Sequence, residues 1–466
     1  MKLKMRRWYR PIIAGTGLAI ILGAVLWLNR PLQLPYAAPL PPAPAAQAEP
    51  GGSSPASNTR ASSPEVNPTA FKDQGDLAFV WQGLLYTLDG NTGEVKQLTE
   101  SGQARQPLWS PDGEWLAFMR ATDPQATTGP LWLVRRDGSQ AHQVQGLPSL
   151  AGPQLFSWSP TANVLAVSGN DGLWLVPVAG APRRLVVTSG TVGFAWSPDG
   201  KYLAYSETLP YDSKDPESRS DALYTVAVDG GAPVKQIEAP QAGIEVAGWW
   251  ADGRGVLYWL DPLHSASLAA DGLGLLSLRI GDTKPTRLAT GLPHRDWLSL
   301  SPQGKLLMVT GSGRIVWNNK QLAISDPGAG SVRALDNPAG TVAIDPSLAQ
   351  DGRRIAFVAA RDLGNKVWGF SKPEELTAWI NSRTLWIANS DGSGAHPLTT
   401  AGTGIYQPAW SRDGSHILYI RDNALWLIGA DGGKPEKVVG PFPDRQEPFG
   451  FYGYVSYQDM MAWFQS

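Results

Sequence analysis

The residues of this chain that can carry chemistry are few, and none stands in a known catalytic motif. The 466 residues include no Cys and only five His, so disulfides, thiolate metal sites and a Cys nucleophile are excluded. The sequence has no Gly-x-Ser-x-Gly elbow, no His-Glu-x-x-His and no Gly-rich phosphate loop with Lys. We therefore predict a protein that is not an enzyme and that binds no cofactor.

The histidines and aspartates also favour structural roles over a metal site. His142 and His396 end equivalent Asp-Gly-Ser-x-Ala-His phrases, which indicates repeated positions on edge strands. His264 and His294 lie outside any repeat and are the candidates for a metal ligand or a catalytic base. Most aspartates precede Gly in turns, and no segment has the alternating carboxylates of a calcium loop. We predict no metal.

A second group of candidates is aromatic or apolar and suits partner binding. Most of the 20 Trp recur at repeated positions, whereas Trp317, Trp368 and Trp379 do not and are candidates for exposure. Residues 371–374 read as a capping box with Pro in the first turn of a short helix. Its apolar stripe either folds back over the protein or forms a hot spot for a partner. The candidate partner-binding residues are Tyr211, Trp368, Leu376, Trp379 and Ile380.

The elements that must position these residues follow from one recurring phrase. It consists of an aromatic strand, a Ser-Pro-Asp-Gly-like turn, and a second strand that ends in Ala and an aromatic residue. Asp-Gly between apolar strands is a strong hairpin signal, because Gly supplies the positive φ of a tight turn. Seven copies, spaced roughly 40 to 60 residues apart as propeller blades are, begin at Trp109, Trp158, Trp196, Trp250, Leu300, Gln350 and Trp410.

The two ends of the repeat are incomplete in a complementary way. The first unit begins at Leu77 and lacks its first strand, whereas residues 452–456 look like an unpartnered first strand with residues 461–464 behind it. An open ring would expose two sheet edges. We predict an all-β propeller of four-stranded blades, closed when the C-terminal strand completes the N-terminal blade. Eight blades are expected, and seven are the alternative.

This repeat resembles the TolB-type, or WD40-like (PD40), β-propeller repeat of bacterial envelope proteins, and the resemblance covers essentially residues 76–466. The chain departs from TolB because it lacks the N-terminal α/β domain and has a membrane anchor in place of the export signal. The resemblance therefore implies the fold and leaves a function in the Tol system open. The repeat also resembles the propeller of prolyl oligopeptidase-like peptidases, without their hydrolase domain.

The first 75 residues predict a membrane tether. Five basic residues within 1–10 precede an uncharged apolar run over 11–28, and its length of about 27 Å matches a bilayer core. This charge bias predicts a single-pass protein of the cell membrane with a cytoplasmic N-terminus and an extracytoplasmic propeller. The alternative is a signal peptide cleaved after 46–48. Residues 29–75, rich in Pro, Ala and Ser, predict a disordered linker that leads to the propeller of 76–466.

The positions of the long loops and the net charge limit the classes of function that the protein can have. In each unit the long insertions fall between the second and third strands, so they project from one face, as expected of a binding surface. Without the six Lys and Arg of residues 1–30, 33 basic residues face 41 acidic ones, and this net charge of about −8 disfavours nucleic acid. These insertions are 121–130, 207–221, 261–271 and 361–383.

Two functions agree with these observations. The first is a non-catalytic scaffold that recognises an envelope protein, a peptide or a cell-wall polymer through the loop face, and whose membrane contact is the anchor only. The alternative is a propeller hydrolase with an active site in the central channel, for which carboxylates that converge on the axis would be the sign. A sensor that signals through the ten-residue tail is a third possibility. The oligomeric state is left open.

Overall fold

The computed structural model describes residues 63–465, apart from 124–128, 151–154, 189–190 and 444–451. Residues 61–466 form one compact unit. The predicted cytoplasmic tail, the anchor over 11–28 and the linker as far as residue 62 lie outside the described residues. No helix in the described part of the chain combines the length and the hydropathy that crossing a bilayer needs.

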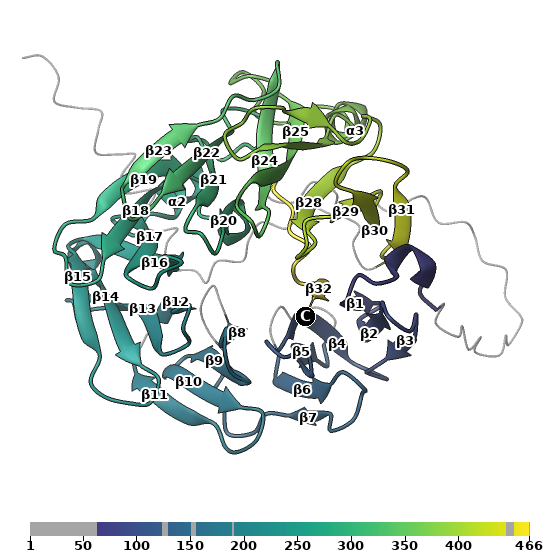
Figure 1. Ribbon diagram of the computed structural model, residues 1–466. Helices are drawn as coiled ribbons and strands as arrows, with labels where there is room; N and C mark the ends of the chain where they lie inside the picture. The colour runs from purple at the N-terminus through teal and green to yellow at the C-terminus, as the bar shows by residue number, and fades with distance from the viewer. Residues whose placement is uncertain (1–62, 124–128, 151–154, 189–190, 444–451, 466) are drawn as a thin grey trace, which may run out of the picture. The chain divides into compact units, whose positions relative to one another are not determined.

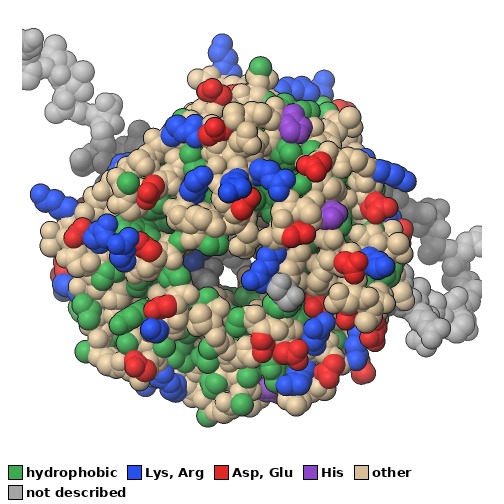
Figure 2. Space-filling model, viewed as in Figure 1, with side chains coloured by type: hydrophobic (Ala, Val, Ile, Leu, Met, Phe, Trp, Pro, Cys, Tyr) green, Lys and Arg blue, Asp and Glu red, His purple; other side chains and the backbone are tan. Residues whose placement is uncertain are grey.

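Eight antiparallel sheets of four strands surround a central opening (Figures 1 and 2). In each sheet the strands, a to d, run in order from the centre of the ring to its rim. The predicted fold class and blade number are therefore confirmed. The repeat resemblance to TolB-type propellers is confirmed at the level of the fold.

The strands of blades 1 to 4 follow the chain in order. Blade 1 contains β4 (Gln103–Trp109), β5 (Trp115–Ala121), β6 (Leu131–Arg135) and β7 (His142–Gln143); blade 2 contains β8 (Phe156–Trp158), β9 (Val164–Gly169), β10 (Gly172–Pro177) and β11 (Arg183–Val187). Blade 3 contains β12 (Thr191–Trp196), β13 (Tyr202–Thr208), β14 (Asp221–Ala227) and β15 (Val234–Ala239); blade 4 contains β16 (Ala242–Trp249), β17 (Gly255–Pro262), β18 (Leu273–Arg279) and β19 (Thr286–Gly291).

Blades 5 to 7 continue the series, and blade 8 joins the two ends of the chain. Blade 5 contains β20 (Leu298–Leu300), β21 (Leu306–Thr310), β22 (Gln321–Asp326) and β23 (Ser331–Ala334); blade 6 contains β24 (Thr341–Leu348), β25 (Arg354–Arg361), β26 (Thr384–Asn389) and β27 (His396–Pro397). Blade 7 contains β28 (Ile405–Trp410), β29 (His416–Arg421), β30 (Ala424–Gly429) and β31 (Glu436–Val439); blade 8 contains β32 (Met461–Phe464), β1 (Asp76–Trp81), β2 (Leu84–Asp89) and β3 (Val95–Gln97).

The described residues include five short helices outside the strands. They are η1 (Pro68–Phe71), η2 (Pro216–Ser218), α2 (Ala266–Asp271), η3 (Arg295–Trp297) and α3 (Pro373–Ile380). All but η1 lie between strands b and c or between strand d and the next strand a. These two kinds of connection share one face of the ring, which we call the b–c face. The a–b and c–d turns form the opposite face.

The repeated Ser, Asp and Gly build the a–b turn. Ser110 Oγ donates to Asp112 Oδ1 (2.6 Å) and accepts from the Trp115 amide (2.9 Å), while Gly113 takes a φ of +72°. The same Ser–Asp hydrogen bond recurs in blades 3 and 7 at 2.6 and 2.7 Å. These aspartates are occupied within their own turns, which is the structural role that the sequence predicted.

The repeated Trp of strand a ties each blade to its neighbour. The indole of Trp158 donates to the carbonyl of Leu108 (3.0 Å), and that of Trp410 donates to the carbonyl of Ser347 (3.1 Å). Trp109 makes the equivalent bond to Ala462 (3.2 Å). The C-terminal strand thus receives the same contact as any other strand a, so the ring is closed by the ordinary interface between blades.

The closing strand is 461–464, and not the expected 452–456. β32 pairs with β1 in the register Asp76↔Phe464 to Phe79↔Met461, and Trp463 Nε1 donates to the carbonyl of Gln74 (2.6 Å). Residues 452–457 instead cross the b–c face over blades 5 to 7. The predicted closure is confirmed. Because residues 461–464 form the closing strand, residues 452–457 have a different role.

Residues 63–75, assigned to the linker by composition, are packed on the propeller. Val66 forms a bridge with Val439, and Ala70 and Phe71 of η1 are buried, with Phe71 against Trp463. The apolar side chains of these two consecutive residues anchor the short segment on the propeller. Composition did not predict this, because the sequence before the segment is rich in Pro and Ser. The ordered domain therefore begins before residue 76.

Candidate functional site at the mouth of the channel

Three innermost strands carry the same local distortion. Gln106, Asp345 and Gln407 have φ values of +50°, +50° and +43°, and each precedes a Pro. The strand pairing slips by a residue at each of these positions, which identifies a β-bulge. A non-Gly residue at positive φ costs of order 1 kcal/mol or more and marks a position worth attention. Two of the three bulges, those in blades 6 and 7, lie next to another segment, and this segment contains an acidic residue.

That segment is η3, the crossing from blade 4 to blade 5, and its central residue is Asp296. Tyr454 Oη donates to Asp296 Oδ1 (2.7 Å), and Gln407 Nε2 donates to Asp296 Oδ2 (2.7 Å). The residue keeps part of its surface exposed. Desolvation raises the pKa of Asp296 to about 6, with the nearby Asp345 adding to the rise and the two hydrogen bonds opposing it.

Asp345 lies beneath Asp296 and is almost inaccessible, with 6% of its surface exposed. Trp297 Nε1 donates to its Oδ1 (3.2 Å), and the Gln407 amide donates to its Oδ2 (3.2 Å). Burial raises the pKa of Asp345, and the charge of Arg383 lowers it. Asp345 therefore orients the bulge of blade 7 and the end of η3, while Asp296 is the more exposed residue of the two.

An aromatic stack covers one side of Asp296. The rings of His294 and Tyr454 lie parallel with centroids 3.5 Å apart, and Trp297 meets both edge-on at 5.1 and 5.8 Å. Desolvation, with the charge of Lys320, lowers the pKa of His294 to about 4, so its imidazole is neutral at pH 7. Burial and Asp296 raise the pKa of Tyr454, so its hydroxyl stays a donor.

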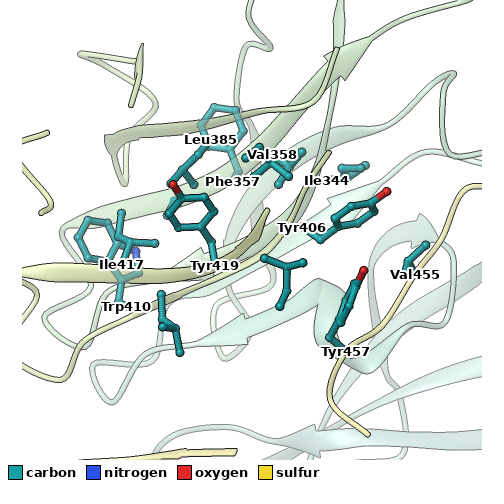
Figure 3. Close-up of a cluster of buried hydrophobic side chains, with 14 of the residues drawn as sticks. Ile344, Phe357, Val358, Leu385, Tyr406, Trp410, Ile417, Tyr419, Val455 and Tyr457 are labelled. Carbon is teal, nitrogen blue, oxygen red and sulfur yellow. The ribbon is translucent and has the colours of Figure 1, made fainter. Parts of the chain in front are cut away.

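The C-terminal segment 452–457 holds this arrangement together. The Val316 amide donates to the Tyr452 carbonyl (3.0 Å), and Gln407 Oε1 accepts from the Tyr457 amide (2.7 Å). Val455 and Tyr457 are buried in the core between blades 6 and 7, where Tyr457 lies 5.7 Å from Tyr406 (Figure 3). The segment that supplies Tyr454 is therefore anchored on both sides of it.

The buried side chain of Arg383 also holds the segment 452–457 in place. It is 1% exposed, donates from NH2 to the Gly453 carbonyl (2.7 Å), and lies over the rings of Trp379 (4.6 Å) and Tyr406 (4.2 Å). The charge also faces Asp345. The buried guanidinium is thus stabilised by a carbonyl, two aromatic rings and a carboxylate, so the role of Arg383 is structural.

We expect Arg383→Leu to lower the free energy of unfolding by about 3–5 kcal/mol, because it leaves Asp345 as an uncompensated buried charge. The exposed Arg353→Ala is the matched control and should change stability by no more than about 0.5 kcal/mol. Urea unfolding monitored by Trp fluorescence measures both. Equal stability of the two variants would contradict the assigned role.

A second charged group lies on blade 4 beside η3. Glu245 of β16 is partly buried, and desolvation raises its pKa while the charge of Arg295 lowers it. Arg295 donates from its guanidinium to the carbonyls of Phe194 and Val246. Glu245 therefore faces the guanidinium of Arg295, the residue before Asp296. These groups, with His294, Gln407 and Tyr454, define what we call the mouth site.

The residues predicted to bind a partner differ in their exposure. Trp368 is 70% exposed and Tyr211 is 44% exposed, whereas Trp379 and Ile380 are 1% and 8% exposed; Leu376 packs at the edge of the core. Helix α3 was predicted correctly, although Ser371 does not cap it with its side chain. The expected exposure of Trp317 and Trp379 is wrong, because loop 361–383 folds back and packs their rings 5.6 Å apart.

Among the candidate histidines, only His294 enters the mouth site. His142 and His396 are exposed on strands d, each bonded to a nearby carbonyl. His264 lies in the blade 4 loop, 3.7 Å from Asp221. In the described part of the chain no three His, Asp or Glu side chains are grouped as metal ligands.

A large groove among the described residues lies elsewhere. It measures about 920 Å³ and runs between the a–b and c–d turns of blades 4 to 6, on the face opposite the mouth site. Its acidic groups include Asp252 and Asp391, whose pKa values are lowered by hydrogen bonds within their own turns. The volume of this groove thus points away from Asp296, whose pKa is raised to about 6, so we base the site on the chemistry of its side chains.

Comparison with known proteins finds likeness in fold to solved structures only. The sequence matches no family model, and no curated protein matches it. Porphyromonas gingivalis dipeptidyl peptidase 4 shares 10% identity over 80% of this chain and 59% of its own, with a TM-score of 0.53. A prolyl endopeptidase (11%, 81% and 49%, TM-score 0.45) and TolB from Acinetobacter baumannii (17%, 72% and 66%, TM-score 0.35) also match.

The chain spans less than two thirds of the length of either peptidase. At these identities the likeness shows the fold alone. The prediction that the chain is not an enzyme is nevertheless corrected, because the solved structures that share its fold include a dipeptidyl peptidase. That prediction was based on the absence of a sequence motif. A motif is not a reliable sign here, because the mouth site is assembled from four separate parts of the chain. The chain is an eight-bladed propeller of four-stranded blades, and its structural neighbours include a dipeptidyl peptidase.

Proposed function

We propose that this protein is a hydrolase whose active site is the mouth site, with Asp296 as the general acid. The observation that carries the proposal is a partly exposed carboxyl, held by Tyr454 and Gln407, whose pKa is raised to about 6. A pKa near the working pH is what acid–base catalysis requires. A second carboxyl, that of Asp345, lies close enough to raise the pKa of Asp296 further.

In this proposal protonated Asp296 donates its proton to the leaving atom as the scissile bond breaks. The hydrogen bonds from Tyr454 and Gln407 then stabilise the carboxylate that remains. Glu245, across the Arg295 crossing, is the carboxylate that takes a proton from the attacking water. Asp345 is a positioning residue, because its contacts orient Trp297 and the bulge at Gln407.

The proposal predicts how the rate depends on pH. Asp296 must be protonated at the start, so kcat/KM should fall as pH rises through about 6. His294, with a pKa of about 4, adds no limb above pH 5. Tyr454→Phe removes a hydrogen bond that favours the carboxylate, so it should move the falling limb upward by about one pH unit.

The measurement is a pH–rate profile of each variant on a substrate that the wild-type protein turns over. Tyr211→Phe changes an exposed phenol of another loop and is the control, with an unchanged profile expected. A limb that stays in place in Tyr454→Phe, or that moves downward, would remove Asp296 from the role of acid.

A further inference from the structure

The interface between blades 7 and 8 differs from the other interfaces at which strand a carries a Trp. Six blades have a Trp at the same register position of strand a, opposite an aliphatic residue of strand b. Five of these indoles donate to a carbonyl on strand a of the preceding blade, at 3.0–3.2 Å. The five are Trp109, Trp158, Trp196, Trp249 and Trp410, and the sixth Trp is Trp463 of β32.

Trp463 is turned toward the N-terminal segment. Its Nε1 donates to the Gln74 carbonyl (2.6 Å), and its ring lies 6.2 Å from that of Phe71. At the five other interfaces the acceptor is the residue directly before the corresponding position of the preceding blade. In blade 7 that residue is Ala409, which precedes Trp410. The carbonyl of Ala409 receives no indole from the described part of blade 8.

The space beside Ala409 is an open pocket of about 410 Å³, which we call the seam pocket. Ala409 and Leu418, which are paired on β28 and β29, line it from blade 7, and Met461 and Trp463 line it from β32. Leu418 is buried, whereas the other three keep part of their surface exposed. A volume of this size is typical of small-molecule sites. The seam pocket therefore offers an apolar space at the interface that the strand-a indole does not seal.

The polar groups of the seam pocket are amides and one cation. Gln350, Gln458 and Gln465 supply the amides, and Arg412 is the one charged residue among the described residues that line it. The Arg412 amide donates to Gln465 Oε1 (2.6 Å), and NH1 of its guanidinium donates to the Gln465 carbonyl (3.1 Å). These contacts hold Arg412 at the end of β32. A guanidinium beside a pocket without an acidic lining residue favours a carboxylate and disfavours a cation.

We propose that the seam pocket binds an indole ring that carries a carboxylate. The ring packs against Met461 and Trp463 and donates its N–H to the carbonyl of Ala409, as the strand-a indoles do at the other interfaces. The carboxylate pairs with Arg412. The same chemistry occurs in a free indole acid and in a peptide that ends in Trp. The inference is independent of the proposed hydrolase activity.

Calorimetric titration of the full-length protein tests the proposal. The ligands are indole-3-acetate, the tripeptide Gly-Gly-Trp and, as the control with a cation on the same ring, tryptamine. At least one of the two acids should bind with a Kd of about 0.1–1 mM, and tryptamine should bind about 10-fold more weakly or worse. Ala409→Leu fills the seam pocket and should weaken the acids about 10-fold or more. Binding of the free acid or of the tripeptide alone identifies the source of the ligand.

Arg412→Gln separates recognition of the carboxylate from a structural role. It should weaken indole-3-acetate or the tripeptide about 10-fold and leave the binding of uncharged indole unchanged, because only the carboxylate contacts the guanidinium. Arg353→Gln, at an exposed arginine of the blade 6 turn, is the matched control and should bind as wild type does. Three results would overturn the inference: no binding of either acid, equal binding by folded Ala409→Leu, or an equal loss of indole and acid in Arg412→Gln.

Discussion

Deletion of residues 461–466 is expected to open the ring and abolish cooperative folding at 37 °C. The deletion removes β32 and leaves β1 as an exposed edge. It also removes the acceptor of the Trp109 indole and the packing of Trp463 on Phe71. Loss of the partly buried Trp463 and of four cross-strand pairs costs about 5 kcal/mol, comparable with the whole stability of many domains.

Thermal unfolding followed by circular dichroism measures this effect, and size-exclusion chromatography detects association through the open edges. A synthetic peptide of residues 452–466 added to the truncated protein should restore part of the lost stability, because it offers the same strand to β1. Trp463→Ala is the milder variant, with a loss of about 3 kcal/mol expected. A truncated protein that stays monomeric with an unchanged melting temperature would contradict closure by β32.

Closure and the mouth site are coupled through the same segment. The chain runs from Tyr454, which bonds Asp296, through the Met460 carbonyl, which accepts from the Val80 amide (2.8 Å), into β32. Truncation should therefore remove catalysis even where some blades remain folded. In Trp463→Ala, activity and ring closure should be lost together as temperature rises.

The sequence predicted the ring well because blade formation is local. Each Asp-Gly turn and each pair of apolar strands lies within one repeat, so the periodicity of Trp109, Trp158 and Trp410 revealed the architecture. The closing strand was also predicted, with the wrong residues. Residues 452–456 have the alternating aromatic pattern of a strand, but their side chains are used by the mouth site and the core between blades 6 and 7.

The mouth site was missed because its partners are distant in the chain. Asp296 and Gln407 are separated by 111 residues, and Asp296 and Tyr454 by 158, and no local pattern links them. One signal was present: a polar residue followed by Pro within strand a, as at Gln106, Asp345 and Gln407, identifies the bulges. The break in pattern at Trp317 and Trp379 was interpreted as exposure, although buried loop packing breaks a repeat equally well.

Asp296→Asn is expected to lower kcat by about 10²- to 10⁴-fold, the contribution of a general acid. The new amide faces Gln407 Nε2, a second donor, so some loss of stability is expected, and the comparison is made below the melting temperature of the variant. Asp362→Asn, on the same face and bonded to the Gly364 amide (2.7 Å), is the matched control. It should keep wild-type activity.

The most direct measurement is the hydrolysis of a panel of p-nitrophenyl glycosides, esters and peptidyl anilides by wild-type, Asp296→Asn and Asp362→Asn proteins between pH 4 and 8. The account predicts that wild-type and Asp362→Asn proteins turn over at least one substrate, faster at pH 5 than at pH 8, and that Asp296→Asn does not. Turnover by Asp296→Asn at the wild-type rate, or none by any protein, would contradict a hydrolytic site at the mouth of the channel.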